Sequence, residues 1–553
     1  MKAKPCHDLR EATLTVMRSV TVPAFDVIRN PPQAVPLMTK CEGLRSNRKN
    51  LLFGGLIMNI NQAKEYIKND ISMYLKKDEF GDYRIPVVRQ RPVFLLGAPG
   101  IGKTAIMEQI AEELNLALVS YSMTHHTRQS ALGLPFIKQK NYEGMGYDVS
   151  EYTMSEIIAT IYDTMEQSGV KEGILFLDEI NCVSETLAPS MLQFLQYKVF
   201  GRHKVPEGWV VVTAGNPPLY NKSVREFDVV TLDRLKVIEV EADYDTWRKY
   251  AVERSVHPSI ISFLDIKKDF FYHMETVAGG RSYVTARGWE DVSEMIKLYE
   301  EDGLAVDETL VGQYLRNDKI VKEFTAYYDL FNRYKNDYRV DAILAGDISD
   351  TAVERAKKAS FDERLSLLSL LTDKVETDMK ETVTRSDFLK LLMPGLKSIK
   401  EKSEAGESVK DEVIKLSGAY ENGLKSREAA GALSREEKKK YKRAIVFLEK
   451  VSKELDSPEA KGFDTVNAAF DAEVAAMREL SVKTGNKLKN LFAYAEKAFE
   501  DGNELLILVT ELTVNTYSAE FISMFKSEEY TRLSELLMVS QRAGDLKEEI
   551  LGA

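Results

Sequence analysis

VFLLGAPGIGKT, at residues 93–104, decides the fold of this chain. Its first four residues are apolar, which is expected of a buried parallel strand. The other eight match the phosphate-binding pattern G-x-x-x-x-G-K-[ST] at every specified position, and Ile106, Ile110 and Leu114 then mark one face of a helix. A chance Gly-rich turn is the alternative, but it would not require this flanking strand and helix. The order of strand, glycine loop and helix predicts an α/β fold whose loop N–H groups and helix N-terminus bind phosphate.

The glycine loop supplies the expected nucleotide-binding residues. Lys103 would reach the β- and γ-phosphates, and the Thr104 hydroxyl would ligate magnesium. The full set of expected contacts is Gly97, Ala98, Pro99, Gly100, Ile101, Gly102, Lys103, Thr104 and Ala105.

Two further apolar runs end in polar residues suited to the same site. Residues 174–179 read ILFLDE, and acids at the C-terminal end of a strand lie where open α/β sheets bind ligands. Asp178 is suited to holding magnesium through water, and Glu179 to acting as a general base; the alternative is an ordinary acidic pair at a helix start. The strand expected at 209–213 is followed by Asn216, whose amide suits the attacking water or the γ-phosphate, although Gly-Asn-Pro also favours a simple turn.

The order of these motifs, followed by the residues TLDR at 231–234, resembles the MoxR family of AAA+ ATPases over roughly residues 60–340. The resemblance implies an AAA+ αβα sandwich with a parallel sheet and a helical lid, and ATP and Mg²⁺ as cofactors. In that family Lys103 and Thr104 would be the Walker A residues, and Asp178 and Glu179 the Walker B residues.

The same resemblance implies catalytic roles for three further side chains. Asn216 would be sensor 1, Arg234 the arginine finger that reaches a neighbouring subunit's ATP, and Arg287 sensor 2. The family usually has proline where this chain has Ala286. Two alternatives stay open: Arg225 competes for the finger role, and either Arg234 or Arg287 would also make an ordinary surface cation.

Two segments resemble insertions that face the pore in such rings. Residues 122–167 are similar to a helix-2 insert, and residues 197–205 read as a β-hairpin turning at 201–203. Both are candidates for substrate or partner contact, and a long surface loop is the alternative. His125 and His126 have no acids or cysteines at ligand spacing, so we interpret them as polar loop residues. Cys182 is expected to be a small buried side chain.

The chain divides into four expected segments. Residues 1–57 carry nine Lys/Arg against four Asp/Glu and show no regular period, so we expect them to be disordered or to precede a true start at Met58. Residues 58–245 would form the nucleotide-binding domain and residues 246–340 the helical lid. Residues 341–553 would form an all-α module, in which Ser434 opens a helix and the basic run 438–443 is a solvated face.

Composition limits the function further. The chain is 44% apolar, no apolar run reaches the ~18 residues that span a bilayer, and three cysteines without a pairing pattern fit a reducing cytoplasm. The net charge of −11 makes nucleic acid an unlikely partner. The resemblance implies a hexameric, chaperone-like ring that remodels or activates partner proteins, with von Willebrand factor A domain proteins expected among them. The alternatives are a nucleotide-gated scaffold with little turnover and a nucleic-acid- or GTP-dependent motor.

Overall fold

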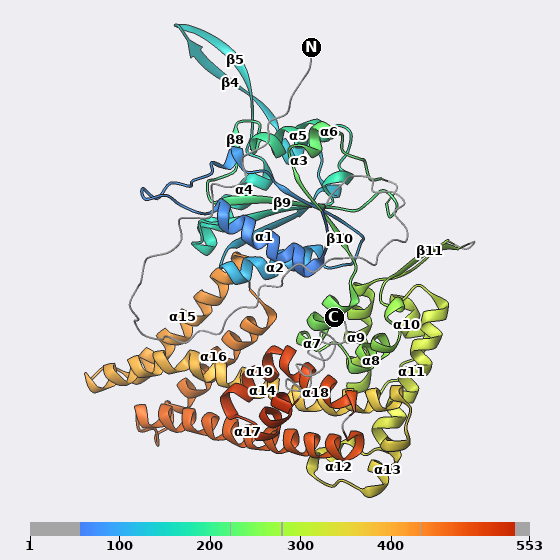
Figure 1. Cartoon of the computed structure of the whole chain (residues 1–553). Helices are drawn as coiled ribbons and strands as arrows, with labels where there is room; N and C mark the ends of the chain where they lie inside the picture. Colours follow the sequence, from blue (N-terminus) through green and yellow to red (C-terminus); the bar gives the residue numbers. More distant parts are fainter. Residues whose placement is uncertain (1–55, 222, 278–279, 432, 501, 537–553) are drawn as a thin grey trace, which may run out of the picture. The chain divides into compact units, whose positions relative to one another are not determined.

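The computed structural model describes residues 56–221, 223–277, 280–431, 433–500 and 502–536 (Figure 1). The expectations for residues 1–55 lie outside this range. Strand β1 (Leu56–Asn59) contains Leu56 and Ile57, which pair with Ile238 and Glu239. The expected boundary before Met58 therefore cuts a strand of the sheet, because the apolar residues on both sides of it pair with the same neighbour.

The predicted parallel sheet is present and has six strands in the order β1-β10-β2-β9-β6-β3. All five neighbouring pairs are parallel. The apolar runs at 93–96, 174–177 and 209–213 form its buried centre, because a strand covered on both faces needs apolar side chains on both. The remaining strands are β2 (Val93–Gly97), β3 (Ala117–Ser122), β6 (Gly173–Asp178), β9 (Trp209–Gly215) and β10 (Lys236–Glu241).

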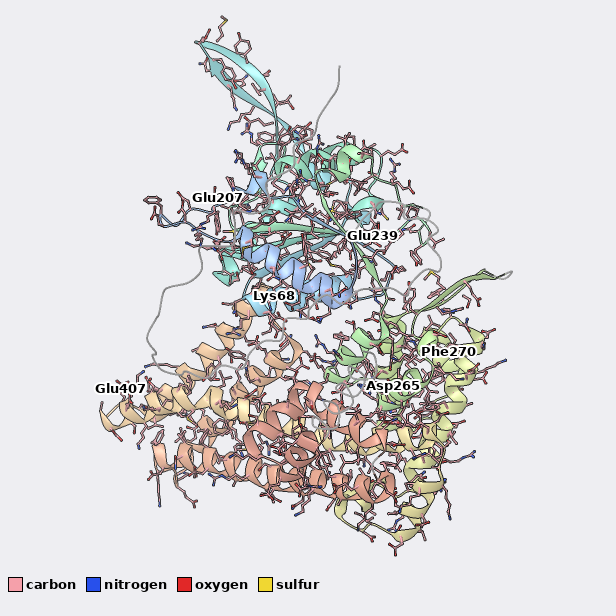
Figure 2. The ribbon with its side chains drawn as sticks, viewed as in Figure 1. Lys68, Glu207, Glu239, Asp265, Phe270 and Glu407 are labelled. Atoms are coloured by element: carbon pink, nitrogen blue, oxygen red, sulfur yellow. The ribbon has the colours of Figure 1, made fainter. Side chains whose placement is uncertain are left out.

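Helices cover the sheet. The apolar faces of α1 (Ile60–Tyr74) and α2 (Lys103–Leu114) pack on one side of it in a shared core, and Figure 1 shows α5 (Ala188–Tyr197) on the other. Glu113 on α2 forms ion pairs with Lys64 and Lys68 on α1, and Figure 2 labels Lys68. The other helices of this region are α3 (Arg128–Leu132), α4 (Glu156–Ser168) and α6 (Val229–Leu232).

Both expected insertions contain antiparallel hairpins. In the segment 122–167, β4 (Pro135–Tyr142) pairs with β5 (Met145–Tyr152) through a turn in which Glu143 and Gly144 both have positive φ, as a type I′ turn requires. The hairpin before Asn216 is also present, as β7 (Val199–Phe200) and β8 (His203–Lys204). Its turn is shorter than predicted, because His203 pairs with Phe200.

The sequence pattern predicts a helical lid, but the structure shows that this region also contains two strands. Between its helices lies a hairpin of β11 (His273–Val277) and β12 (Gly280–Val284). The aromatic side chains of Phe263, Trp289 and Phe324 form the centre of the lid core. The helices are α7 (Tyr244–Glu253), α8 (Pro258–Ile266), α9 (Ala286–Glu301), α10 (Glu308–Tyr314) and α11 (Asp318–Asp337).

From residue 340 onward the described chain is all helical, as predicted. The divisions expected at 245/246 and 340/341 fall inside α7 and α12. Ser434 caps α16 as expected, accepting a hydrogen bond from the Glu437 amide at 3.1 Å. The helices are α12 (Val340–Ala345), α13 (Asp350–Lys358), α14 (Phe361–Glu404), α15 (Val409–Ala429), α16 (Arg435–Glu454), α17 (Phe463–Phe499), α18 (Asn503–Val514) and α19 (Thr516–Phe525).

No single described helix is long and apolar enough to cross a bilayer. Helices α18 and α19 together have the length and composition of a span, but they meet at a bend of 88°.

The turn between α15 and α16 contacts the edge of the sheet. The Leu118 amide on edge strand β3 donates to the Ala430 carbonyl at 2.7 Å. Arg427 pairs with Glu437, and Lys438 with Glu428, so ion pairs join the two helices beside this turn. This contact covers a sheet edge that would otherwise present unpaired backbone groups.

Candidate functional site

A cavity of about 620 Å³ lies at the C-terminal ends of β6 and β9, over the glycine loop. Its walls come from parts of the chain that are distant in sequence: the start of α1, the glycine loop with α2, the ends of β6 and β9, the lid helices α7 and α9, and the end of α18. It is lined by every expected site residue except Gly97, Ala98 and Arg234, which are not among its wall residues.

The glycine loop has the backbone geometry that its sequence predicts. Gly102 has φ +96° and directly precedes α2, which starts at Lys103. A side chain at Gly97 would lie 2.7 Å from the Val240 carbonyl oxygen on β10. Gly97 is therefore required because of close packing, and Gly102 because of its left-handed backbone conformation. The first turn of α2 presents N–H groups that have no partner within the helix, which suits an anion.

Lys103 is buried at the base of the cavity. Its Nζ donates to the carbonyl oxygens of Gly97 and Ala98, both at 2.8 Å, and to Asn216 Oδ1 at 2.9 Å. Burial lowers the pKa of Lys103 to about 8, which the nearby Asp178 carboxylate partly opposes. A buried ammonium held by neutral acceptors has a strong preference for an anionic ligand, because a phosphate would supply the missing counter-charge.

Thr104 and Asp178 meet as the motif predicts. The Thr104 Oγ1 lies 3.1 Å from Asp178 Oδ2. No group of three or more His, Cys, Asp or Glu residues in the described ranges forms a ready metal site. Mg²⁺ commonly takes one or two carboxylates and completes its shell with water and substrate phosphates. One hydroxyl and one carboxylate beside a phosphate-binding loop therefore fit Mg²⁺ that arrives with a nucleotide.

Glu179 lines the cavity and is held by a residue that the sequence analysis missed. Ser122, at the end of β3, donates to Glu179 Oε2 at 3.0 Å. Glu179 itself has φ +55°, and its amide donates to Asp178 Oδ1 at 2.8 Å. The carboxylates of Asp178 and Glu179 thus have different partners: Asp178 faces Thr104, and Glu179 faces Ser122.

The amide of Asn216 lies in the cavity and is not merely part of a turn. Its side chain accepts from Lys103, and its backbone carbonyl oxygen accepts a hydrogen bond from Asn181 Nδ2 at 2.9 Å. Asn181 is buried, and a side chain at Gly215 would lie 2.4 Å from its Oδ1. Asn181 was also missed. The only signal in the sequence is its place two residues after Glu179.

Arg287 comes from the first turn of α9. Its amide donates to the Gly100 carbonyl at 3.3 Å, and the residue lines the cavity. Ala286 is the first residue of this helix. Proline is well tolerated at that position, so alanine and proline are structurally equivalent here. The departure from the family pattern does not alter the placement of Arg287.

The two finger candidates have different surroundings. Arg225 pairs with Glu185 at 2.5 Å, and its amide donates to the Asn181 carbonyl at 2.9 Å. Arg234 follows α6, and its guanidinium makes no hydrogen bond or ion pair with any described residue. Its charge acts only at longer range, where it adds to the hydrogen bonds from Thr231 that lower the pKa of Asp228. Among the described residues, Arg234 therefore has no direct ionic partner, and it is not a wall residue of the cavity in its own chain.

The residues interpreted as non-catalytic have ordinary contacts. His126 lies within 3.2 Å of Ser130 Oγ, and the His125 side chain is outside the described residues. Cys182 is half-buried and accepts from Asn221 at 3.4 Å. Burial and the neighbouring carboxylates of Glu179 and Asp178 raise the pKa of the Cys182 thiol, which opposes the reactive thiolate form.

The end of the cavity away from the phosphate loop is lined by aromatic residues that the sequence analysis did not select. Trp247 and Tyr250 on α7 donate to the two oxygens of Glu290 at 3.2 and 3.4 Å. Ile60 and Asn61 at the start of α1 line the same cavity. Apolar walls with a few polar groups are typical of a site for a heterocyclic base.

Comparison with known proteins finds a family match for the part of the chain that carries the glycine loop, Asp178, Glu179 and Asn216. Residues 92–235 match the family described as "AAA domain (dynein-related subfamily)". No curated protein sequence matches the chain. Among solved structures, a point mutant of RuvB from Thermotoga maritima matches at 14% identity and a TM-score of 0.27, covering 53% of this chain and 88% of that one. Residues 92–235 therefore match an AAA domain, and this match supports a general ATPase function.

Proposed function

We propose that this protein is an oligomeric AAA+ ATPase of MoxR type that binds ATP with Mg²⁺ and uses its hydrolysis to remodel, assemble or activate partner proteins. The observation that carries the proposal is the convergence of Lys103, Thr104, Asp178, Glu179 and Asn216 at one end of the cavity.

Each residue has a role that its position supports. Lys103 and the loop amides would bind the phosphates, and Thr104 and Asp178 would hold Mg²⁺, which would supply positive charge against the phosphate oxygens. Glu179 accepts the proton of the attacking water, and Asn216 orients that water or the γ-phosphate. Arg287 adds a cation from the lid side, so that closure of the lid completes the site.

The site requires a neighbouring subunit to be complete. Hydrolysis spreads negative charge over the departing phosphoryl group, and an arginine supplied in trans accelerates the reaction by ~10³–10⁵. Arg234 is our choice for this residue because it has no direct ionic partner among the described residues and is not a wall residue of its own chain's cavity. Head-to-tail contacts that supply Arg234 to the next subunit close into a ring, for which the resemblance implies a hexamer.

The partner proteins are proposed from the resemblance and from one exposed element. The β4–β5 hairpin exposes apolar side chains, among them Ile137 at 76% and Met145 at 63%. An exposed apolar patch on an ordered hairpin is typical of a protein-contact surface. We propose von Willebrand factor A domain proteins as the partner class and the cytoplasm as the location.

A trap variant tests the proposal. Glu179→Gln should bind ATP, lose Mg²⁺-dependent hydrolysis by about 10²–10³-fold, and retain partners in a pull-down from the native host. Lys103→Ala is the matched control, since it should lose binding as well as hydrolysis. Wild-type protein that binds ATP and shows no turnover at any concentration would instead identify a nucleotide-gated scaffold. Stimulation by DNA or preference for GTP would identify the motor alternative.

A further inference from the structure

The junction of α18 and α19 is a fixed bend. The two helices meet at 88°, and Asn515 between them is buried. Its Oδ1 accepts hydrogen bonds from the amides of Tyr517 at 2.9 Å and Ser518 at 3.3 Å, while its own amide donates to the Glu511 carbonyl at 3.0 Å. One side chain thus caps the second helix at the point where the first ends. The bend therefore holds the residues beside it in defined positions.

This bend is attached to the lid helix α7. Thr516 Oγ1 donates to Glu253 Oε1 at 3.1 Å. Arg248, also on α7, lies 3.6 Å from the Glu511 carboxylate and 2.7 Å from Asp265, which Figure 2 labels in the lid. Glu511 is buried, so Arg248 is its compensating charge. The helix that carries Trp247 and Tyr250 into the cavity is therefore bonded to the C-terminal region.

Val514, the last residue of α18, lines the same cavity as the glycine loop. Other apolar residues of α18, Leu508, Val509 and Leu512, are buried in the helical core, whereas Val514 remains 37% exposed. An exposed valine at a helix end is common by itself. Here it lies on a fixed bend, one residue from the cap and two from a bond to α7, and it lines the same cavity as Trp247 and Tyr250.

We propose that Val514 contacts the base or ribose of a bound nucleoside triphosphate, so that nucleotide binding and docking of the α18–α19 bend on α7 stabilise each other. The glycine loop would hold the phosphates, so the base and ribose would contact other residues that line the cavity. A ligand that contacts both surfaces must strengthen their association, and the coupling is reciprocal. The inference rests on the proposed nucleotide site and gives the helical region a role as a reporter of nucleotide state.

The test compares two valine-to-aspartate variants of the full chain. ADP and a non-hydrolysable ATP analogue are titrated by calorimetry into wild type, Val514→Asp and Val482→Asp. Val482 is an exposed valine on α17 outside the cavity. Val514→Asp should weaken binding about tenfold, because it replaces an apolar contact with a charge that the bound nucleoside would desolvate. Val482→Asp should bind like wild type. Equal affinities for the two variants would overturn the inference.

Hydrogen exchange provides the second readout. In wild type, ADP should slow amide exchange at residues 511–518, and Lys103→Ala should abolish this protection. Where Val514→Asp fails to fold, Val514→Ala replaces it, with an expected two- to threefold loss of affinity. Binding by wild type without any change at residues 511–518 would refute the inference alone. Absence of nucleotide binding by wild type would refute the proposed function itself.

Discussion

Ser122 Oγ donates a hydrogen bond to Glu179 Oε2 at 3.0 Å, so the proposed general base is held by a neighbouring strand of its own sheet. β3 lies at the sheet edge beside β6, and Ser122 pairs with Asp178 in the strand register. The hydrogen bond orients the carboxylate and occupies one lone pair that an attacking water could otherwise use. We therefore expect release of Ser122 from Glu179 to increase hydrolysis.

Ser122→Ala should raise basal ATP turnover by about three- to fivefold, because loss of one hydrogen bond of ~1 kcal/mol frees the carboxylate to bind water. The measurement is steady-state phosphate release at saturating ATP. Ser120→Ala, on the same strand and exposed, is the control and should leave the rate unchanged. Unchanged or slower turnover in Ser122→Ala would show that this bond does not restrain the base.

Arg234→Ala should lower turnover by about 10³-fold and should also poison wild-type subunits when the two are mixed, because each wild-type site would need its neighbour's arginine. The measurement is activity across a mixing series at fixed total protein. Arg225→Ala is the matched control, since Arg225 is paired with Glu185 and should retain most activity. Activity proportional to the wild-type fraction would mean that Arg234 does not act in trans.

The local part of the site could be predicted from the sequence because its signals are contiguous. The glycine loop, Asp178-Glu179 and Asn216 each follow a strand that is apolar on both faces, and parallel strands bring their ends together. The family resemblance added the two arginines, and the structure places Arg287 in the cavity. The all-α character of residues beyond 340 also followed from helical periodicity and the absence of strand signals.

The rest depended on long-range packing that no local pattern records. Ser122 matters only because β3 lies next to β6, and Asn181 only because its amide reaches the residue that follows β9. Val514 comes from a helix more than 400 positions beyond the glycine loop and is an ordinary apolar residue by sequence. The β11–β12 hairpin was missed because its two five-residue strands lie among strongly periodic helices.

Lys198→Met should reduce the pH dependence of stability. Lys198 is buried, and burial lowers the pKa of its ammonium from 10.5 to about 7. Between these values the unfolded chain binds a proton that the folded protein does not, so this group makes wild-type stability rise with pH from about 7 to 10.5. Lys198→Met should therefore melt at a higher temperature than wild type, and this difference in melting temperature should be largest near pH 6 and shrink towards pH 10.

The control for that experiment is Lys204→Met, an exposed lysine on the hairpin that directly follows Lys198. Its melting temperature should follow the wild-type curve across the whole pH range, because an exposed ammonium has little desolvation to lose. Parallel curves for Lys198→Met and wild type would show that the buried lysine keeps its ordinary pKa in the folded protein.

Gly431→Val should detach the α15–α16 turn from the sheet edge. Gly431 has φ +68°, and a Cβ there would lie 2.6 Å from the Leu118 carbonyl oxygen, which belongs to the backbone and cannot rotate away. We expect about 2–3 kcal/mol of lost stability and faster amide exchange at Leu118.

Gly406→Val is the matched control, because Gly406 also has positive φ but a Cβ there would meet nothing within 4 Å. Gly406→Val should lose only the ~1–2 kcal/mol that comes from backbone strain, and it should leave amide exchange at Leu118 unchanged. Equal exchange at Leu118 in the two variants would mean that the helical hairpin does not rest on this strand.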